Sequence, residues 1–316
     1  MKPMQSPKRS ISYAKWGLIF ITPFILVYLI FTLTPQLLTL YNSFFENYRD
    51  GLRQIGPKFV GLKNFIKLFT PNKNGSVLVF KYAWNTILLW ILGAVPQFII
   101  ALLLAVLFTS NRLNVKPQGL YKTVIYMPNL IMASAFSMLF FALFSRVGPV
   151  NQILQQLGWI DESIDFLSMK ITVRSLIAFM NFLMWFGNTT IVLMAGIMGI
   201  DQCLFESAQI DGANAWKVFF KVTMPLLKPI FIYSLITALI GGIQMFDVPQ
   251  VLTNAKGMPN NTSTTLVMWL NSYLSTSRNF GMSGALSVII FIITAILSVI
   301  VYRFLVNGNS IKVSKK

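Results

Sequence analysis

Charged and aromatic residues at helical spacing are concentrated in one short segment, "ESAQIDGANAWKVFFKVTMPLLKP" (residues 206–229), between two long apolar runs. Leu204–Ile210 has the spacing of a helix. Asp211 can offer a side-chain oxygen to the free amides that begin a following helix, and Gly212 permits a tight reversal of the chain. The residues predict two short helices joined by a turn, whose chemistry is contact with another surface rather than bond making.

The second predicted helix, Asn214–Val222, has an aromatic face and a basic face. These faces are formed by Trp216 with Phe220 and by Lys217 with Lys221. Pro225 should end or kink the helix before the next apolar run. From the residues alone, two interpretations stay open: a knob that protrudes into water, or an ordinary connector that lies on lipid headgroups.

Several other chemistries are excluded by what the chain lacks. It has no histidine and one cysteine, Cys203, so it has no catalytic histidine, internal disulfide or multi-cysteine metal site. It has no G-x-x-x-x-G-K-[ST] loop to cradle the phosphates of ATP. The net charge of +17 fits basic residues at the ends of membrane spans better than nucleic-acid binding.

The composition indicates a membrane protein, with 55% hydrophobic and 11% charged residues and a mean hydropathy of +0.66. Six runs without charged residues are apolar enough to cross a bilayer, which needs about 20 helical residues. They are Trp16–Phe45, Tyr82–Asn111, Thr123–Ser145, Ser175–Ile200, Pro229–Phe246 and Asn279–Tyr302. Continuous apolar runs favour helices, so we predict an all-α polytopic fold with six transmembrane helices.

The predicted organisation places a first transmembrane helix at 17–41 and an outer loop at 42–81. A core of five further spans occupies 82–306 and includes a loop at 201–228. Tails occupy 1–16 and 307–316. With both tails in the cytoplasm, the inner segments hold fourteen of the 26 basic residues and are the shorter ones, as the positive-inside rule favours. Residues 201–228 then lie in the cytoplasm.

Two outer segments carry weaker patterns. Within 42–81, Leu62–Phe69 is amphipathic and suggests a helix on the lipid surface. Within 146–172, "VGPVNQILQQLGW" and the acidic "DESIDF" suggest a short helix lying at the interface, followed by a loop.

The segment opened by Glu206 resembles the EAA loop of binding-protein-dependent ABC importer permeases. The similarity is carried by Glu206-x-Ala208-x-x-Asp211-Gly212-Ala213, followed by Phe219 and Met224-Pro225, with Ser207 where the family usually has alanine. "FVGLKNF", "WNTILL", "GLYKTVIYMPNLI", "LMAGIMGID" and "FDVPQVLTNAKGMPNNTSTTL" resemble the carbohydrate-importer branch in the same order, in permeases of the MalF or UgpA type. In relatives a Gly-Gly-Pro turn often stands where this chain has "AKGMPNN".

The resemblance implies a MetI-like type I permease fold and a transport subunit that is not itself an enzyme. It implies four kinds of partner: a second homologous permease, a dimer of ABC ATPases that binds ATP and Mg²⁺, an extracellular solute-binding lipoprotein, and a sugar. It implies a multi-pass protein of the bacterial cytoplasmic membrane. It also implies that an ATPase grips the EAA loop through its coupling residues. These are Glu206, Ala208, Asp211, Gly212, Ala213, Trp216, Phe219 and Pro225.

Polar residues inside spans are costly and often functional. Asn181, Trp185 and Asn188 follow one another at spacings of four and three, which places them on one helical face. Neutral amides beside an aromatic ring suit a sugar, and Gln244 and Asp247 extend the candidate set at the end of the fifth span. Hydrogen bonds between helices, or anchoring of the tryptophan at the interface, remain alternatives.

Other functions are weighed against this prediction. An ion-coupled secondary transporter would use acidic residues inside its spans, and the six runs contain none. A membrane enzyme would need clustered acids or histidines. A permease for a polyamine, phosphate or amino acid remains the nearest alternative. The sequence does not identify the sugar.

Overall fold

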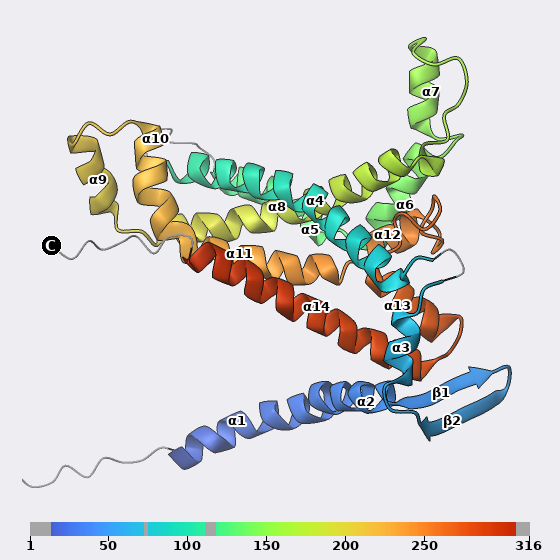
Figure 1. The fold of residues 1–316 in the computed structure, drawn as a ribbon. Helices are drawn as coiled ribbons and strands as arrows, with labels where there is room; N and C mark the ends of the chain where they lie inside the picture. Colours follow the sequence, from blue (N-terminus) through green and yellow to red (C-terminus); the bar gives the residue numbers. More distant parts are fainter. Residues whose placement is uncertain (1–13, 73–74, 111–117, 308–316) are drawn as a thin grey trace, which may run out of the picture.

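The structure is a computed structural model that describes residues 14–72, 75–110 and 118–307, so the predicted tails lie largely outside the described residues. Six helical segments in the described part are long and apolar enough to cross a membrane. They are Lys15–Ser43, Leu78–Thr109, Ala133–Gln156, Lys170–Met198, Ala215–Leu252 and Phe280–Val306. The main spans run in a common direction between two ends of the molecule (Figure 1). We call these the knob end, marked by α9 and α10, and the hairpin end, marked by β1 and β2.

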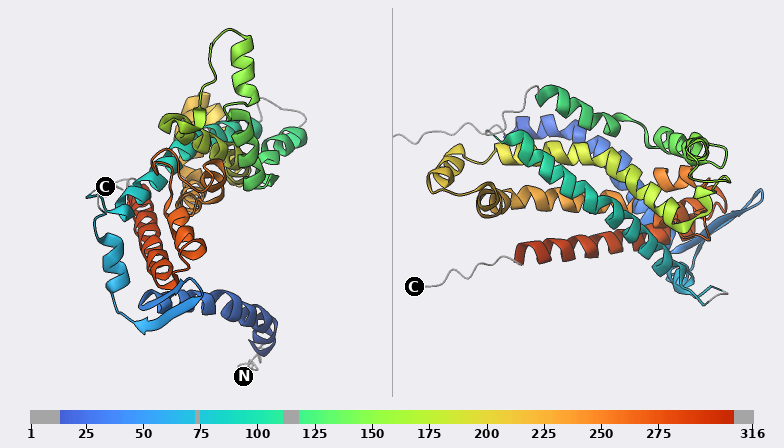
Figure 2. Two further views of the ribbon diagram at one scale, coloured as in Figure 1. Left: turned by 90° about the vertical axis from the view of Figure 1, so that its right-hand side faces the viewer. Right: turned by 90° about the horizontal axis from the view of Figure 1, so that it is seen from above.

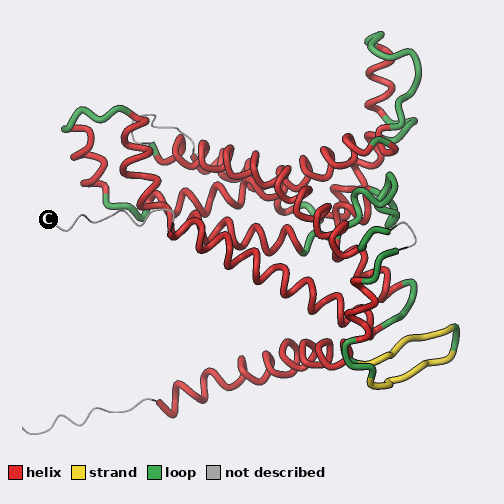
Figure 3. The backbone as a smooth tube through the Cα atoms, viewed as in Figure 1, coloured by secondary structure: helices red, strands yellow, loops and turns green. Residues whose placement is uncertain are grey.

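The first span stands apart from the others. It comprises α1 (Ala14–Tyr28), a π-helical turn at Leu29–Leu33, and α2 (Thr34–Ser43). No residue in its most apolar stretch is buried. It diverges from α14 toward the knob end and meets the rest of the chain only near the hairpin end (Figures 1 and 3). Lipid or another chain must therefore cover most of its surface.

A β-hairpin follows the first span, and the sequence did not predict it. Strands β1 (Phe45–Asp50) and β2 (Arg53–Phe59) pair antiparallel. Tyr48 forms an isolated bridge with Asn279 at the start of α14. The sequence predicts an outer loop for residues 42–81, and both strands lie within that range.

Helix α3 (Lys63–Phe69) confirms the predicted helix, but the expected position on the lipid surface is only half right. Asn64 is buried and donates to the backbone oxygens of Ser43 and Phe45, at 2.9 Å each. Leu68 is 2% exposed. One side of α3 therefore packs on protein, and the other side carries the exposed Ile66.

The second and fourth spans, α4 (Leu78–Thr109) and α8 (Lys170–Met198), pack along each other. The third span is not the single helix that the apolar run predicted. It is divided at Ile131–Met132 into α5 (Gln118–Leu130) and α6 (Ala133–Phe144). The two halves have different partners, because α5 lies along α8 whereas α6 packs mainly on α12. Figure 2 shows both halves beside the bundle.

The remaining elements are mostly helical. They are α7 (Pro149–Gln156), a 3₁₀ turn (Phe166–Ser168), α9 (Gln202–Ile210), α10 (Ala215–Val218), α11 (Met224–Ile243), α12 (Asp247–Leu252), α13 (Leu266–Ser275) and α14 (Phe280–Asn307). Three buried apolar clusters lie within the bundle. The cluster nearest the knob joins α4, α8 and α11 through Ala101, Leu193 and Leu227, and the knob residue Phe205 packs against it.

Candidate functional site

The charged and aromatic segment between the fourth and fifth spans folds into two short helices at one end of the bundle (Figure 1). We call residues 201–223 the knob. The Asp201 side chain caps α9 by accepting the amide hydrogen of Cys203 at 2.9 Å. The Asn214 side chain caps α10 by accepting that of Lys217, also at 2.9 Å. The expectation that Asp211 caps the second helix is therefore wrong, since Asp211 instead ends the first helix.

The turn between the helices depends on Gly212. Its φ is +70°, a left-handed conformation that strains residues with a Cβ atom. The Gly212 amide donates to Gln209 O at 3.0 Å, and the Ala213 amide donates to Ala208 O at 2.9 Å. These are the paired bonds of a Schellman motif. The Ala208, Gly212 and Ala213 positions of the motif thus form one turn.

The second helix of the knob does not end at Pro225. Helix α10 continues through a π-helical stretch, Phe219–Thr223, directly into α11. Proline has no amide hydrogen, and its ring would clash with the carbonyl four residues earlier. The wider π turn, with Met224 N–H bonded to Phe219 O, accommodates it. The second helix of the knob is therefore continuous with the fifth span.

The knob presents its aromatic residues on two sides. Trp216 is 72% exposed and stacks on the exposed Phe220, with ring centroids 6.0 Å apart. Phe219 is half-buried and points back toward the bundle, as a lining residue of the cavity described next. Glu206, Asp211 and Pro225 are exposed. The outward side therefore combines an apolar patch with charge.

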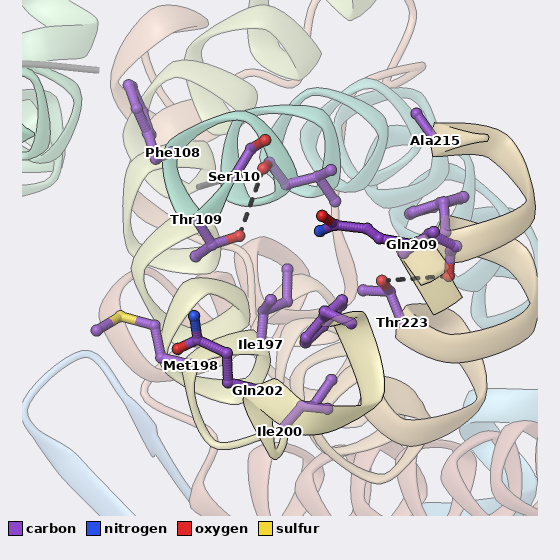
Figure 4. Close-up of a pocket in the computed structure, with 14 residues that line it drawn as sticks. Phe108, Thr109, Ser110, Ile197, Met198, Ile200, Gln202, Gln209, Ala215 and Thr223 are labelled. Atoms are coloured by element: carbon purple, nitrogen blue, oxygen red, sulfur yellow. Dashed lines mark hydrogen bonds between the residues drawn. The ribbon is translucent and has the colours of Figure 1, made fainter. Parts of the chain in front are cut away.

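A cavity of about 410 Å³ separates the knob from the ends of α4 and α8. Phe205, Gln209 and Phe219 line it from the knob, and Thr109 and Ile197 line it from the spans. Figure 4 shows Gln209 extending into this space toward the end of α4. The knob is thus tied to the bundle through α11 and through Phe205, and it does not pack closely over the ends of the spans.

The three candidate residues on α8 differ in their hydrogen bonds and in their exposure. The Asn181 amide donates to Ile177 O at 2.8 Å on its own helix and approaches the sulfur of Met245 at 3.5 Å. Trp185 is 48% exposed and Asn188 is half-buried. The Asn188 side chain makes no hydrogen bond within the described residues. Asn181 therefore joins α8 to the end of α11, whereas Trp185 and Asn188 stay accessible.

From Tyr233 onward the uncovered face of α11 carries polar side chains, and only its end was predicted from the sequence. Gln244 and Asp247 are exposed. Tyr233 (64% exposed), Thr237 and Gly241 precede them at spacings of four, four and then three, so they share one face. By contrast, the exposed large residues in the middle of α14, such as Phe291 and Ile296, are apolar. This spacing at Tyr233 and Thr237 was overlooked in the sequence, because tyrosine and threonine are common within membrane spans.

The accessible residues of α8 and α11 lie at the same depth. The Asn181–Met245 contact fixes the antiparallel alignment of the two helices. With equal rise per residue along both helices, Trp185 is level with Gly241, and Asn188 lies within one residue of the level of Thr237. A hydroxyl-rich molecule at this depth would meet an aromatic ring, amides and hydroxyls, and no charge.

A further polar network, missed from the sequence, lies toward the hairpin end. The Arg174 guanidinium on α8 donates to Thr262 O at 2.8 Å and to Asn85 Oδ1 at 2.7 Å. The Asn85 amide donates to the backbone oxygens of Asn261 and Thr264. Side chains of two spans thus hold the backbone of the 253–265 loop. This contact fixes the loop in which the sequence departs from its relatives.

Comparison with known proteins gives concordant results. Residues 82–309 match the family described as "Binding-protein-dependent transport system inner membrane component". The lactose transport system permease protein LacF of Rhizobium radiobacter is 29% identical over 283 residues, covering 89% of this chain and 91% of LacF. The arabinooligosaccharides transport system permease protein AraP of Bacillus subtilis (strain 168) is 28% identical over 300 residues, covering 94% and 91%.

A solved structure has the same fold. The crystal structure of a bacterial ABC transporter involved in the import of the acidic polysaccharide alginate contains a chain that superposes with a TM-score of 0.75. The sequence identity is 22%, and the match covers 93% of this chain and 96% of that one. The all-α polytopic fold predicted from the apolar runs and from the EAA resemblance is thereby confirmed, with the hairpin as an addition.

Proposed function

The chain belongs to the family of inner membrane components of binding-protein-dependent transport systems, and on this premise we propose that it forms half of the path by which an ATP-driven importer moves a sugar or oligosaccharide. One observation carries the proposal: the helix runs without interruption from Ala215 in the knob to Ile243 in the membrane. A force applied to the knob therefore moves α11 and its polar face.

ATP is hydrolysed by separate polypeptides. A pair of ATPase subunits binds ATP and Mg²⁺ and grips the knob from the cytoplasm. The outward stack of Trp216 and Phe220 supplies the buried aromatic anchor typical of such contacts, and Glu206 adds charge at the rim. The Schellman turn holds α9 and α10 in a fixed relation, and the space beneath the knob lets the knob tilt together with α11. This places the knob end, and both tails, in the cytoplasm.

The transported molecule passes along the faces of α8 and α11. Trp185 stacks on a sugar ring, and Asn188, Thr237 and Gln244 bond its hydroxyls. The names of LacF and AraP, which are sugar permeases, support this chemistry. A second homologous permease closes the path from the other side, and an extracellular lipoprotein delivers the sugar at the hairpin end, where Asp247 lies.

Reconstitution tests the proposal. The chain, its partner permease, the ATPase pair and the binding protein are placed in proteoliposomes and offered radiolabelled neutral oligosaccharides, anionic sugars, a polyamine and an amino acid. We expect uptake of a neutral oligosaccharide that requires both ATP and the binding protein. Uptake driven by an ion gradient without ATP, or uptake only of a charged solute, would overturn the assignment.

Two substitutions test the path itself. Trp185→Ala and Asn188→Leu should each raise the KM for the sugar at least tenfold, because a loss of about 1.4 kcal/mol of binding free energy weakens binding by that factor. Phe179→Ala, at an exposed apolar position earlier on α8, is the matched control and should leave KM within twofold. Equal effects from all three changes would mean that α8 has only a packing role.

A further inference from the structure

Helix α7 (Pro149–Gln156) leaves the bundle at the hairpin end and runs across the direction of the spans (Figure 1). The turned view also shows it standing away from the other helices (Figure 2). Because the spans cross the membrane, a helix that runs across them extends along the membrane plane. Its residues can therefore show which surface it lies on.

The two sides of α7 differ sharply in polarity. At 100° per residue, Val150, Ile153, Leu154 and Leu157 fall on one side, and Asn151, Gln152, Gln155 and Gln156 fall on the other. Ile153 is 55% exposed, Leu157 57%, and Trp159, just beyond the helix, 74%. Ile153 and Leu157 therefore expose apolar surface, which water would not stabilise, and Gln152, Gln155 and Gln156 are exposed on the other side.

The polar side is held by the chain itself. Asn151 is 1% exposed. Its amide donates to the backbone oxygens of Ser145, Arg146 and Ile164, and its Oδ1 accepts the amide hydrogen of Ile164 at 2.9 Å. The Gln155 amide donates to Ser163 Oγ at 3.4 Å. These bonds fix the rotation of α7 about its axis, so the outward position of its apolar side is built into the fold.

The direction of the apolar side follows from the position of the loop at 157–165. Figure 1 shows this loop on the side of α7 farther from the knob. The loop is bonded to Asn151 and Gln155, so Ile153, on the opposite side of α7, faces back toward the depth of the membrane. Asp161 and Glu162 are exposed on the loop.

We propose that α7 is an interfacial anchor whose apolar side rests among the lipids of the leaflet at the hairpin end. The preceding helix, α6, also exposes apolar side chains, at Met138 and Leu139. Trp159 has the amphipathic ring that settles at headgroup level. One side of an eight-residue helix is far smaller than the roughly 800 Å² per partner of a stable protein interface. Lipid therefore fits this surface better than a protein partner does.

Site-specific fluorescence tests the proposal in the assembled transporter. Cys203→Ser gives a chain without cysteine, into which Ile153→Cys, Leu157→Cys or Gln152→Cys is introduced singly and labelled with the environment-sensitive dye NBD. Each assembled transporter is placed in nanodiscs with or without lipids that carry a doxyl quencher near the headgroup. We expect blue-shifted emission and at least twofold stronger quenching at 153 and 157 than at 152.

Gln152 is the matched control because it lies next to Ile153 on the opposite side of the same helix. Equal quenching at 152, 153 and 157 would overturn the proposal. Blue-shifted emission at 153 without quenching by lipid would also overturn it, by showing that protein covers the face. The readout is independent of the transported solute, so it does not depend on the proposed function.

Discussion

Gly158 and Gly212 have the same backbone conformation at opposite ends of the bundle. Each has a φ of +70° and follows the last turn of a short helix. The Gly158 amide donates to Gln155 O at 3.0 Å, and the next amide, of Trp159, donates to Leu154 O at 3.0 Å. The bonds around Gly212 are the same pair. The two turns therefore provide a natural control for each other, because local strain is equal and only one turn lies in the knob.

Gly212→Pro should abolish coupling without abolishing insertion. Proline cannot adopt a positive φ and removes the amide that bonds Gln209 O, so the angle between α9 and α10 is lost. We expect ATP-dependent uptake and binding-protein-stimulated ATPase activity to fall at least tenfold at an unchanged amount of membrane protein. Gly158→Pro makes the same local change at the hairpin end and should leave ATPase stimulation within twofold. Loss of stimulation in both variants would refute a specific role for the knob.

Trp216→Ala should weaken attachment of the ATPase and leave the permease folded. The side chain is 72% exposed, so the isolated chain loses little packing. Removal of a buried aromatic anchor from an interface costs about 2 kcal/mol or more, which weakens binding roughly thirtyfold. The dissociation constant of the ATPase from the permease pair in nanodiscs provides the measurement.

Trp159→Ala is the matched control for this prediction. Trp159 is 74% exposed but lies at the opposite end of the bundle, so its removal should leave ATPase affinity unchanged. If Trp216→Ala also bound the ATPase with unchanged affinity, the aromatic patch would not be the docking surface.

The spans and the knob could be predicted because their signals are local. Runs of apolar residues predict spans, and the spacing of Trp216 and Phe220 predicts their stacking. Asp211 was assigned the capping role of Asn214 because both residue types cap helices well. Which residue caps the second helix depends on where that helix begins, and the left-handed turn at Gly212 sets this position. When two residues are equally able to cap a helix, only the path of the backbone shows which of them does so.

Features that depend on distant partners could not be predicted. The break at Ile131–Met132 arises because α5 and α6 pack against different elements. The bridge that joins the hairpin to the start of α14 links Tyr48 to Asn279, which is far away in the sequence. Arg174 resembles an ordinary basic residue at the end of a span, and its role is set by backbone oxygens about 90 residues later in the chain.

Arg174→Met should loosen the 253–265 loop. The substitution removes the donors to Thr262 O and Asn85 Oδ1, and hydrogen bonds to charged groups contribute about 1.5–3 kcal/mol each. We expect amide hydrogen exchange in the loop to accelerate at least tenfold in the purified transporter. Lys170→Met removes an exposed cation from the same helix and should leave the exchange unchanged. Unchanged protection in Arg174→Met would show that the loop is held by other contacts.

Cys203 tests both the electrostatics and the sidedness of the knob. The hydrogen bond with Asp201, followed by the negative charge of that residue, raises the pKa of the exposed Cys203 thiol. Thiolate is the reactive form, so alkylation should be slow near neutral pH and accelerate at higher pH than for an ordinary thiol. Asp201→Asn keeps an oxygen to cap α9 but removes the charge, so it should shift the rate profile to lower pH. Asp211→Asn, at the far end of α9, should not shift it.

The same thiol reports the orientation of the chain. A membrane-impermeant maleimide should label Cys203 in inverted membrane vesicles and leave it unlabelled in intact cells, because the proposed orientation places the knob in the cytoplasm. Labelling in intact cells would place the knob outside, beyond the reach of an ATPase, and would invalidate the coupling mechanism. Since the chain has one cysteine, Cys203→Ser gives the background signal for both measurements.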